Sequence, residues 1–256
     1  MENKTNVQVS VIMPALNEEE NIAAALSNVI EAFNFYNING EIVVINDGST
    51  DKTQSIIDAF SESRNNIKTI KHGNPFGIGV SFWEGVDVCS GSVVVMLPGD
   101  NENDSFEILR YYKLLEHVDM VIPFNFNAEV RPMYRNALSF IYRFIINSTF
   151  LVNFRYTNGT ILYRKSILEE LTYHSDGFFF QTDILIRLAK RGYLFAEVPY
   201  KLGKRKSGLS KAITFPSLIQ VIKGYCRLVG DFYFKNKDKY KDFSSDSITG
   251  LRRDKV

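Results

Sequence analysis

A chain of 256 residues is long enough to bury one large core and does not require a second domain. Apolar residues make up 45% and charged residues 23%, which excludes a wholly disordered chain. The net charge of +1 conceals an asymmetry, because residues 201–256 hold 14 Lys and Arg against five Asp, a balance of +9 that leaves −8 for residues 1–200. The C-terminal quarter therefore either faces an anionic partner or only keeps the chain in solution.

The cysteines and the hydropathy pattern bear on the cellular compartment. Cys89 and Cys226 match neither a disulfide framework nor a metal-ligand spacing, so a reducing cytoplasm fits best. The polar N-terminus does not look like a signal peptide, and no apolar run reaches the roughly 18 residues needed to span a bilayer. We therefore expect a cytoplasmic protein that meets a membrane, if at all, at its surface. No signature of RNA or DNA binding is present, and we expect no nucleic-acid partner.

The first half of the chain alternates strand and helix patterns. Short apolar runs predict strands at residues 9–13, 41–45, 67–70, 92–97 and 120–123. Apolar positions at helical spacing predict helices at residues 18–35, 79–89 and 105–116, and a further helix that begins near residue 51 and ends near residue 61. This repetition predicts an α/β protein with a mostly parallel, Rossmann-like sheet flanked by helices, whose ligands bind at the carboxyl ends of the strands.

The second half is less regular. The stretch 136–154 is apolar and aromatic but contains Arg143, Asn147 and Asn153, so it is either a packing helix or a helix that rests on lipid. Further patterns predict a strand at 160–163, a helix at 181–191 and a strand at 195–198. A basic loop with two glycines leads to an amphipathic, aromatic helix at 215–234, and we expect the final dozen residues to be disordered.

Two polar motifs directly follow the first two predicted strands. They read PALNEEENI, at residues 14–22, and INDGSTDKT, at residues 45–53. Each is compatible with a plain helix-capping turn, because Asn, Asp, Ser and Gly favour such turns. Both also lie at strand carboxyl ends, where a nucleotide would dock. There Asp47 could accept a hydrogen bond from a base N–H, and Glu18 could bond a base or a ribose.

A third motif, PGDNE at residues 98–102, follows the apolar run VVVML. A departing diphosphate needs its developing negative charge neutralised, and hard oxygen ligands can hold Mg²⁺ or Mn²⁺ for that purpose. Asp100 is the expected metal ligand, and Glu102 could supply a second carboxylate. A plain acidic turn is the alternative interpretation.

These motifs resemble those of the family 2 glycosyltransferases of the GT-A fold, and within them of the polyprenyl (dolichyl) phosphate sugar synthases. The family patterns are approximately P-x-Y-N-E, D-D-x-S-x-D-x-T and D-A-D-x-Q, where this sequence has PALNE, NDGSTDKT and PGDNE. The segment FFFQTDILIRLAKRGYLFAEVPYKLGKRKSGLSK is similar to the family's F-Q-x-(E/D), E-V-P and R-x-x-G-x-S-K motifs. The resemblance implies a GT-A catalytic domain at residues 1–212, followed at residues 213–256 by an amphipathic helix and a basic, partly disordered tail.

The resemblance also assigns site residues. The expected nucleotide pocket comprises Pro14, Ala15, Asn17, Glu18, Asp47, Gly48, Gly77, Gly79 and Gly99. A nucleotide diphosphate sugar is the implied donor, Asp100 and Glu102 would bind the metal, and catalytic roles fall to Asp100, Asp183, Arg205 and Lys211. Acceptor or phosphate contacts are expected from Arg131, Arg135, Arg155, Gln181 and Ser210. For Arg131 and Arg135, a plain surface charge is an equally good interpretation. The basic loop with Arg205, Ser210 and Lys211 is expected to close over phosphates.

Three positions depart from the family pattern. Pro98 stands where the family has the first aspartate of its metal motif, so a metal would be held by Asp100, Glu102 and diphosphate oxygens, or would be dispensable. Leu16 replaces a common aromatic residue, and NGT at residues 158–160 replaces the Ser-Gly-Phe motif on the acceptor side. The identity of the acceptor is therefore open.

Two reactions and one non-catalytic role are compatible with these residues. A polyprenyl phosphate acceptor needs no strong base, because a phosphate monoester is mostly dianionic at neutral pH. The enzyme would then hold two anionic groups together, and Asp183 would orient an arginine or contact the sugar. A sugar hydroxyl of a growing glycan would need a base, for which Asp183 is the obvious candidate. The third possibility is a nucleotide-sugar-binding protein that lost catalysis with Pro98. His72, His117 and His174 share no motif and are interpreted as structural or surface residues.

Three features predict reversible binding to an anionic membrane surface. They are the positive balance after residue 200, the aromatic helix at 215–234 and the apolar stretch at 136–154. Basic residues near an anionic leaflet contribute about 1 kcal/mol each, and buried aromatic side chains add to this. Because a polyprenyl chain leaves the bilayer only at a cost of about 0.8 kcal/mol per CH₂, we expect the enzyme to go to the lipid, on the inner face of the membrane.

Overall fold

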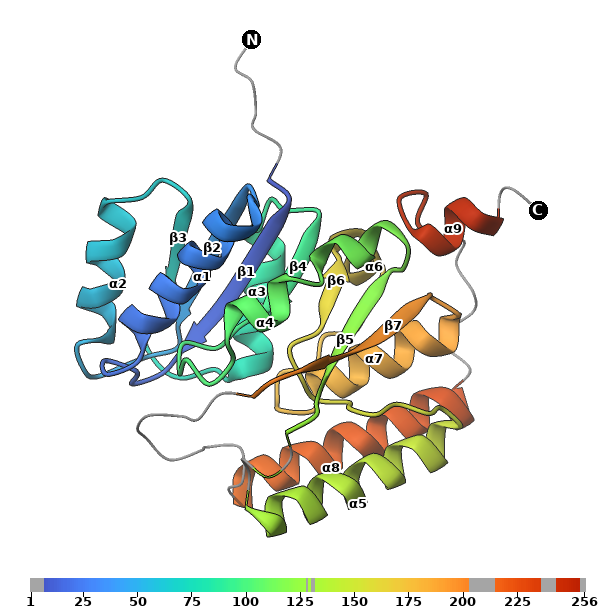
Figure 1. Cartoon of the computed structure of the whole chain (residues 1–256). Helices are drawn as coiled ribbons and strands as arrows, with labels where there is room; N and C mark the ends of the chain where they lie inside the picture. The colour runs from blue at the N-terminus through green and yellow to red at the C-terminus, as the bar shows by residue number, and fades with distance from the viewer. Residues whose placement is uncertain (1–6, 128, 130–131, 203–214, 236–242, 254–256) are drawn as a thin grey trace.

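The computed structural model describes residues 7–127, 129, 132–202, 215–235 and 243–253. Its centre is a seven-stranded sheet in the order β3-β2-β1-β4-β6-β5-β7 (Figure 1). The strands are β1 (Val9–Ala15), β2 (Gly40–Asn46), β3 (Ile67–Lys71), β4 (Val93–Met96), β5 (Met120–Asn125), β6 (Leu162–Arg164) and β7 (Phe195–Tyr200). Neighbouring strands are parallel except at β6, which runs antiparallel to both β4 and β5. The expected mostly parallel sheet is confirmed.

The helices follow the predicted order with two differences. They are α1 (Ile22–Tyr36), α2 (Thr53–Glu62), α3 (Ile78–Val88), α4 (Ser105–Leu109), α5 (Met133–Phe150), α6 (Lys165–Glu169), α7 (Phe180–Arg191), α8 (Phe215–Gly230) and α9 (Ile248–Arg253). The prediction of one helix over residues 105–116 is wrong, because the chain turns after α4 and continues as a short 3-10 helix. At that turn the side chains of Arg110 and Tyr111 both donate to the Pro199 carbonyl, at 3.3 and 2.7 Å. The second difference is that the sequence patterns did not predict the short helices α6 and α9.

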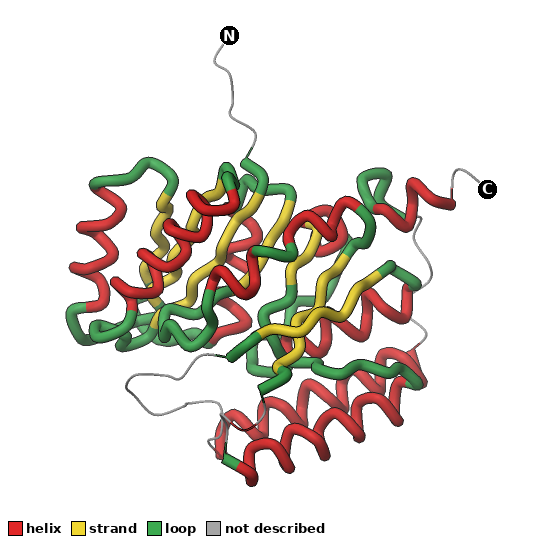
Figure 2. Tube along the Cα trace, in the orientation of Figure 1, coloured by secondary structure: helices red, strands yellow, loops and turns green. Residues whose placement is uncertain are grey.

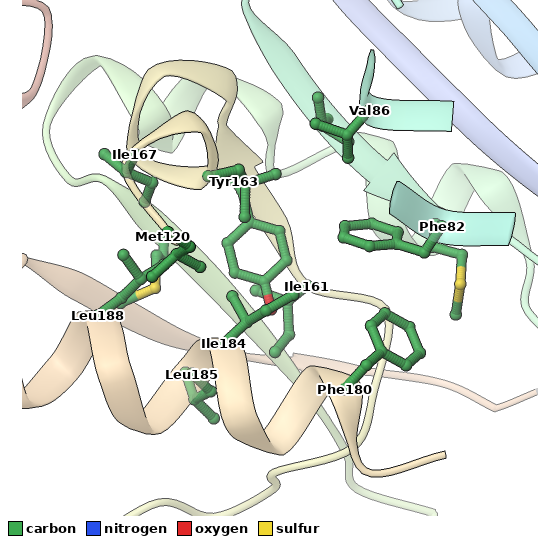
Figure 3. Packing of buried hydrophobic residues seen from close by; sticks show 14 of the residues in the cluster. Phe82, Val86, Met120, Ile161, Tyr163, Ile167, Phe180, Ile184, Leu185 and Leu188 are labelled. Atoms are coloured by element: carbon green, nitrogen blue, oxygen red, sulfur yellow. The ribbon is translucent and has the colours of Figure 1, made fainter. Parts of the chain in front are cut away.

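Two apolar cores lie on the two faces of the sheet. Successive side chains of β1 point to opposite faces, so Ile12 joins one core and Met13 the other. Helices α1, α2 and α4 cover the Met13 face, and α3 and α7 cover the Ile12 face (Figure 2). Figure 3 shows Tyr163 of β6 pointing toward Ile184 of α7, with Phe82 of α3 beside it. Burial on both faces explains the continuous apolar runs of the central strands.

The helices α5 and α8 form a further layer beyond α7 (Figure 1). The hydroxyls of Thr149 and Tyr225 share a hydrogen bond of 2.8 Å, and the rings of Phe150 and Phe232 meet edge-on at 5.8 Å. Leu228 of α8 is fully buried in the core on the α7 side. Helix α8 is therefore an integral part of the packed fold. The expected domain boundary at residue 212 lies outside the described residues.

The outward face of α5 is mostly apolar, and α8 exposes both apolar and charged side chains. Only Ile146 and Phe150 of α5 are buried, whereas large side chains on its other face are more than half exposed. The exposed side chains of α5 include Met133, Tyr134, Leu138, Phe140, Ile141 and Phe144, and those of α8 include Leu218 and Ile222. The interpretation of 136–154 as a packing helix thus holds for one face only. Within the described ranges, no helix is both long and apolar enough to cross a bilayer.

The prediction of a disordered C-terminus is wrong for residues 245–253. The fully buried Asp119 carboxylate accepts hydrogen bonds from the backbone N–H groups of Ile248, at 2.6 Å, and Thr249, at 3.1 Å. These two N–H groups lie in the first turn of α9, where they have no partner within the helix. Just before α9, the ring of Phe243 packs edge-on against Tyr193 at 5.1 Å. A buried carboxylate more than a hundred residues away therefore orders this segment, and local composition does not encode it.

Candidate active site

The loops after β1 and β2 are bonded to each other. The Asn17 side chain accepts a hydrogen bond from the Thr50 N–H at 2.8 Å, and the Asn17 N–H donates to the Ser49 hydroxyl at 2.9 Å. The Glu18 N–H donates to the Thr53 hydroxyl at 2.8 Å. Asn17 has a φ of 54°, a left-handed conformation that asparagine tolerates better than most residues. The two polar motifs thus form one connected surface at the carboxyl ends of β1 and β2.

Asp47, directly after β2, is buried and binds three protein donors. One carboxylate oxygen accepts from His72 Nδ1 at 2.7 Å and from the Phe76 N–H at 2.8 Å, and the other accepts from the Gly77 N–H at 2.9 Å. On its other side, His72 Nε2 bonds the Glu84 carboxylate of α3 at 2.5 Å. Asp47 therefore fixes the loop that leads into α3. The expected contact between Asp47 and a base N–H stays a prediction. Such a contact would be additional to the hydrogen bonds from His72, Phe76 and Gly77.

His72 is positively charged when both of these bonds form, because both ring nitrogens must then be protonated. Burial lowers the pKa of His72, but the hydrogen bonds to Asp47 and Glu84 outweigh burial and raise that pKa above its ordinary value. From the sequence, His72 was interpreted as a structural or surface residue, and its contact with Asp47 was not predicted. The one signal that could have revealed it is its position directly after β3, at the same sheet edge as Asp47.

The predicted pocket glycines have distinct structural reasons. Gly48 and Gly77 have φ values of 79° and 106°, which side chains disfavour. Gly79 instead packs tightly, since a Cβ there would lie 2.3 Å from the Ser175 carbonyl oxygen. Its N–H donates to the Asp176 carbonyl at 3.0 Å. The close approach at Gly79 is therefore made by the chain's own backbone, and it joins the loop before α3 to the segment before α7.

The loop after β4 brings the acidic motif to the same edge. The Gly99 N–H donates to the Pro14 carbonyl at 3.0 Å, which holds this loop against the end of β1. Pro14 and Ala15 are buried within β1. They have no polar side chains, so a ligand could contact only their backbone and their apolar surface. The Asp100 carboxylate accepts from the Glu102 N–H at 3.1 Å, so that both acidic residues belong to one turn.

The donor set of this turn suits a hard divalent cation. Carboxylate oxygens are ligands that Mg²⁺ and Mn²⁺ prefer. Where the structure is described, no group of three or more His, Cys, Asp or Glu side chains is arranged to hold a metal ion. Asp100 and Glu102 therefore fit an ion that completes its coordination with oxygens from outside the protein, as Mg²⁺ does when it binds substrate phosphates.

The acceptor-side residues Gln181 and Asp183 are buried on the first turn of α7. The Asp183 carboxylate accepts from Arg187 Nε at 2.9 Å, and the same guanidinium donates to Asp231, at the end of α8, at 2.8 Å. Burial raises the pKa of Asp183, and the adjacent Arg187 opposes that rise. For Asp231, burial is outweighed by Arg187 and Lys235, which hold its pKa below the usual value. A buried ion-pair network thus joins α7 to α8.

Two of the expected phosphate-binding arginines are described. Arg135 lies half-buried in the first turn of α5. Arg155 is exposed in the segment after α5, with its guanidinium 4.8 Å from the ring centre of Phe124. Arg131, Arg205, Ser210 and Lys211 lie outside the described residues.

A mostly parallel sheet with three polar loops and a carboxylate pair at its carboxyl edge defines a GT-A-type α/β protein. The family model described as "Glycosyl transferase family 2" matches residues 10–172, more than half of the chain. The chain therefore belongs to glycosyl transferase family 2, and both the expected family and the expected fold are confirmed.

Curated relatives match parts of this chain. A dolichyl-phosphate beta-glucosyltransferase of Trichomonas vaginalis is 33% identical over 102 residues, which cover 38% of this chain and 31% of that protein. A bactoprenol glucosyl transferase of Shigella phage SfV is 32% identical over 118 residues, or 45% of this chain and 38% of that protein. These matches span only about a third of the relatives' own length.

Solved structures match more of the chain at lower identity. Glucosyl-3-phosphoglycerate synthase from Mycobacterium tuberculosis, in complex with Mn²⁺, UDP and phosphoglyceric acid, has a TM-score of 0.68 and 21% identity. The match covers 89% of this chain and 80% of that one. The same enzyme in complex with Mg²⁺ and UDP gives a TM-score of 0.67 at 18% identity, with 89% and 81% covered. At this level of identity the likeness shows a shared fold.

Proposed function

We propose that this protein transfers a sugar from a nucleotide diphosphate to a polyprenyl phosphate, with inversion at the anomeric carbon. The choice of acceptor rests on the burial and the hydrogen bonding of Asp183. The best candidate for a general base is buried and bonded to Arg187 at 2.9 Å. A hydroxyl acceptor needs such a base to remove its proton, whereas a phosphate acceptor is already an anionic nucleophile at neutral pH.

The donor would lie at the edge where the loops after β1, β2 and β4 meet. The loop held by Asp47 and the turn that contains Asp100 are both fixed by hydrogen bonds, so little reorganisation is needed when a nucleotide binds. The names of solved neighbours mention UDP with Mn²⁺ or Mg²⁺, which supports a nucleotide diphosphate and a divalent ion for this chain.

Asp100 and Glu102 would hold the ion, which when bound supplies positive charge against the departing diphosphate. The Asp100 turn presents both carboxylates on one short loop, and Pro98 removes any third carboxylate from it. Ligation would therefore rest on these two side chains and on diphosphate oxygens. The chain's own contribution is to hold the two carboxylates beside the nucleotide loops.

Positive side chains would bind the acceptor phosphate. Arg135, in the first turn of α5, and Arg155, after that helix, are the described candidates. Arg131, Arg205 and Lys211, together with the neutral hydroxyl of Ser210, are further candidates outside the described residues. Arginine suits this role because its planar guanidinium grips phosphate oxygens with two parallel hydrogen bonds. The names of the two relatives, which act on dolichyl phosphate and bactoprenol, support a lipid-linked acceptor.

We further propose that the outward faces of α5 and α8 lie in the surface of the inner leaflet. Phe144 is 64% exposed and Leu218 55% exposed, and apolar patches of this extent mark interaction sites on soluble proteins. The two helices lie side by side, and each of them exposes large apolar side chains. A helix that lies in the interface plane needs no spanning segment to stay at the membrane.

Product analysis tests the reaction. The protein is incubated with a labelled nucleotide sugar, a divalent ion and a short-chain polyprenyl phosphate, and the lipid fraction is examined for label. We expect labelled polyprenyl phosphate sugar from the parent and from Asp183→Asn at a reduced rate. Label only in a glycan acceptor, abolished by Asp183→Asn, would support the glycan-extending reaction instead. Binding of nucleotide sugar without any product would support the non-catalytic role.

A further inference from the structure

A shallow hollow of about 390 Å³ opens between α5 and the segment that follows it. Its lining includes Arg143, Arg155, Asn153, Phe140 and Phe144. Two arginines thus line one hollow together with two aromatic residues. This residue set differs from the strand-end loops of the candidate active site, and the sequence analysis gave Arg143 no role.

The arrangement of the hollow is fixed by contacts within it. Arg143 Nη1 donates to the Arg155 carbonyl at 2.7 Å, and its guanidinium lies 5.6 Å from the ring centre of Phe140. Asn147 accepts from the Phe154 N–H at 3.2 Å and donates to the Phe154 carbonyl at 2.9 Å, which fastens the following segment to α5. The side chain of Arg143 is therefore held against the segment that contains Arg155.

The hollow has a net positive charge. Its lining holds two arginines and no carboxylate, and Glu197 of β7 is a neighbour that accepts the Arg155 N–H at 2.6 Å. When Glu197 is counted as well, the two arginines leave a balance of +1. One oxygen of Glu197 is bonded to the backbone N–H of Arg155 and not to its guanidinium. The guanidinium of Arg155 lies over the Phe124 ring.

The hollow is continuous with the apolar outward face of α5. Phe140 and Phe144 line the hollow and are also 59% and 64% exposed. A ligand that fits has an anionic group for the arginines and an apolar chain for the aromatic face. Arg143 lies eight residues after Arg135, which is about 12 Å along a helix, so the hollow is separate from the acceptor-phosphate contact proposed at Arg135.

We propose that this hollow binds the phosphate of an anionic membrane phospholipid, whose acyl chain lies along Phe140 and Phe144. The inference rests on the membrane docking proposed above, and it assigns that docking a specific headgroup site. A headgroup anchored at Arg143 and Arg155 fixes the rotation of α5 about its axis at the membrane. That rotation determines which way the carboxyl edge of the sheet faces the lipid.

Vesicle sedimentation at low ionic strength tests the site. The parent, the Arg143→Gln/Arg155→Gln variant and a matched Arg64→Gln/Arg110→Gln control are compared on phosphatidylcholine vesicles with and without phosphatidylglycerol. The control removes the same charge from two arginines that also lie over aromatic rings, at 5.6 and 4.6 Å. Each arginine near an anionic surface contributes roughly fivefold in affinity, so the first variant should bind about ten- to thirtyfold more weakly to anionic vesicles. The control should change binding by less than about threefold.

Further arms distinguish the alternatives. Arg143→Lys/Arg155→Lys keeps the charge and should retain part of the affinity, and circular dichroism must show that every variant is folded. Short-chain phosphatidylglycerol below its micelle concentration should shift amide signals of residues 140–155 in NMR spectra, whereas inorganic phosphate should not. Parent-like binding by the double Gln variant, equal losses in the control, or equal shifts with inorganic phosphate would each overturn the headgroup site. Failure of the parent to bind anionic vesicles would instead overturn the membrane docking on which it rests.

Discussion

Replacing His72 by glutamine removes the charge that joins Asp47 to Glu84, while it keeps a side chain of similar size. The His72 side chain is 6% exposed, and Asp47, its stronger partner, is 7% exposed. A hydrogen bond between charged groups in such a buried position contributes about 1.5–3 kcal/mol. The Glu84 side chain is 41% exposed, so solvent screening limits that second bond to roughly 0.5 kcal/mol. Because glutamine can keep one neutral hydrogen bond of about 1 kcal/mol, we expect a net loss of about 1–2 kcal/mol of unfolding free energy.

This loss should depend on pH. The pKa of His72 is raised in the folded protein, so its stabilising contribution is complete below the ordinary histidine pKa of about 6.5 and is lost as the pH rises through the raised folded value. Denaturant unfolding of parent and His72→Gln across the neutral and alkaline range measures this. The difference between the two proteins should be largest on the acidic side and shrink toward alkaline pH. Exposed His117→Gln serves as the control and should follow the parent.

The same substitution should weaken donor binding, because Asp47 holds the Phe76 and Gly77 N–H groups of the loop before α3. Loosening that loop by about 1 kcal/mol corresponds to roughly a fivefold higher KM for nucleotide sugar, with a smaller effect on kcat. Titration calorimetry with the nucleotide diphosphate provides a direct measurement. Parallel pH profiles for parent and His72→Gln, together with unchanged donor affinity, would refute the reasoning and leave His72 as a packing residue.

Three further substitutions test the rest of the site. Asp100→Ala should lower turnover by about two orders of magnitude while the melting temperature is unchanged, and turnover within a few-fold of the parent would remove Asp100 from the chemistry. Glu102→Gln should raise the Mg²⁺ or Mn²⁺ concentration needed for half-maximal activity, because an amide attracts the ion less than a carboxylate does; full parent activity in excess chelator would contradict this. Arg187→Gln should cost about 3–5 kcal/mol of unfolding free energy by leaving the buried Asp183 unpaired, and adding Asp183→Asn should recover part of the loss. Equal stability of the single and double variants would argue against the pair.

The elements that carry the nucleotide motifs were predictable from the sequence. The central strands are buried on both faces and therefore appear as unbroken apolar runs, and the polar motifs begin where those runs end. Parallel strands place their carboxyl ends at one edge of the sheet. The alternation of strands and helices along the chain was therefore enough to predict that the loops with Asn17, Asp47 and Asp100 lie close together. The apolar character of the stretch at 136–154 and the amphipathic character of the helix at 215–234 were likewise predicted, but the sequence did not show which faces of these helices are covered.

Only the tertiary structure decided which polar residues that are distant in the chain pair with each other. His72 lies between Asp47 and Glu84. Arg187 lies between Asp183 and Asp231, which directly follows α8, and Asp119 orders α9. Each of these is a buried polar group that must find a partner once the apolar cores have formed, because leaving it unsatisfied costs about 1–3 kcal/mol or more. Local sequence patterns specify which segments become strands and helices. Which distant polar groups then meet is set by how those segments pack, and the packing is a property of the whole chain.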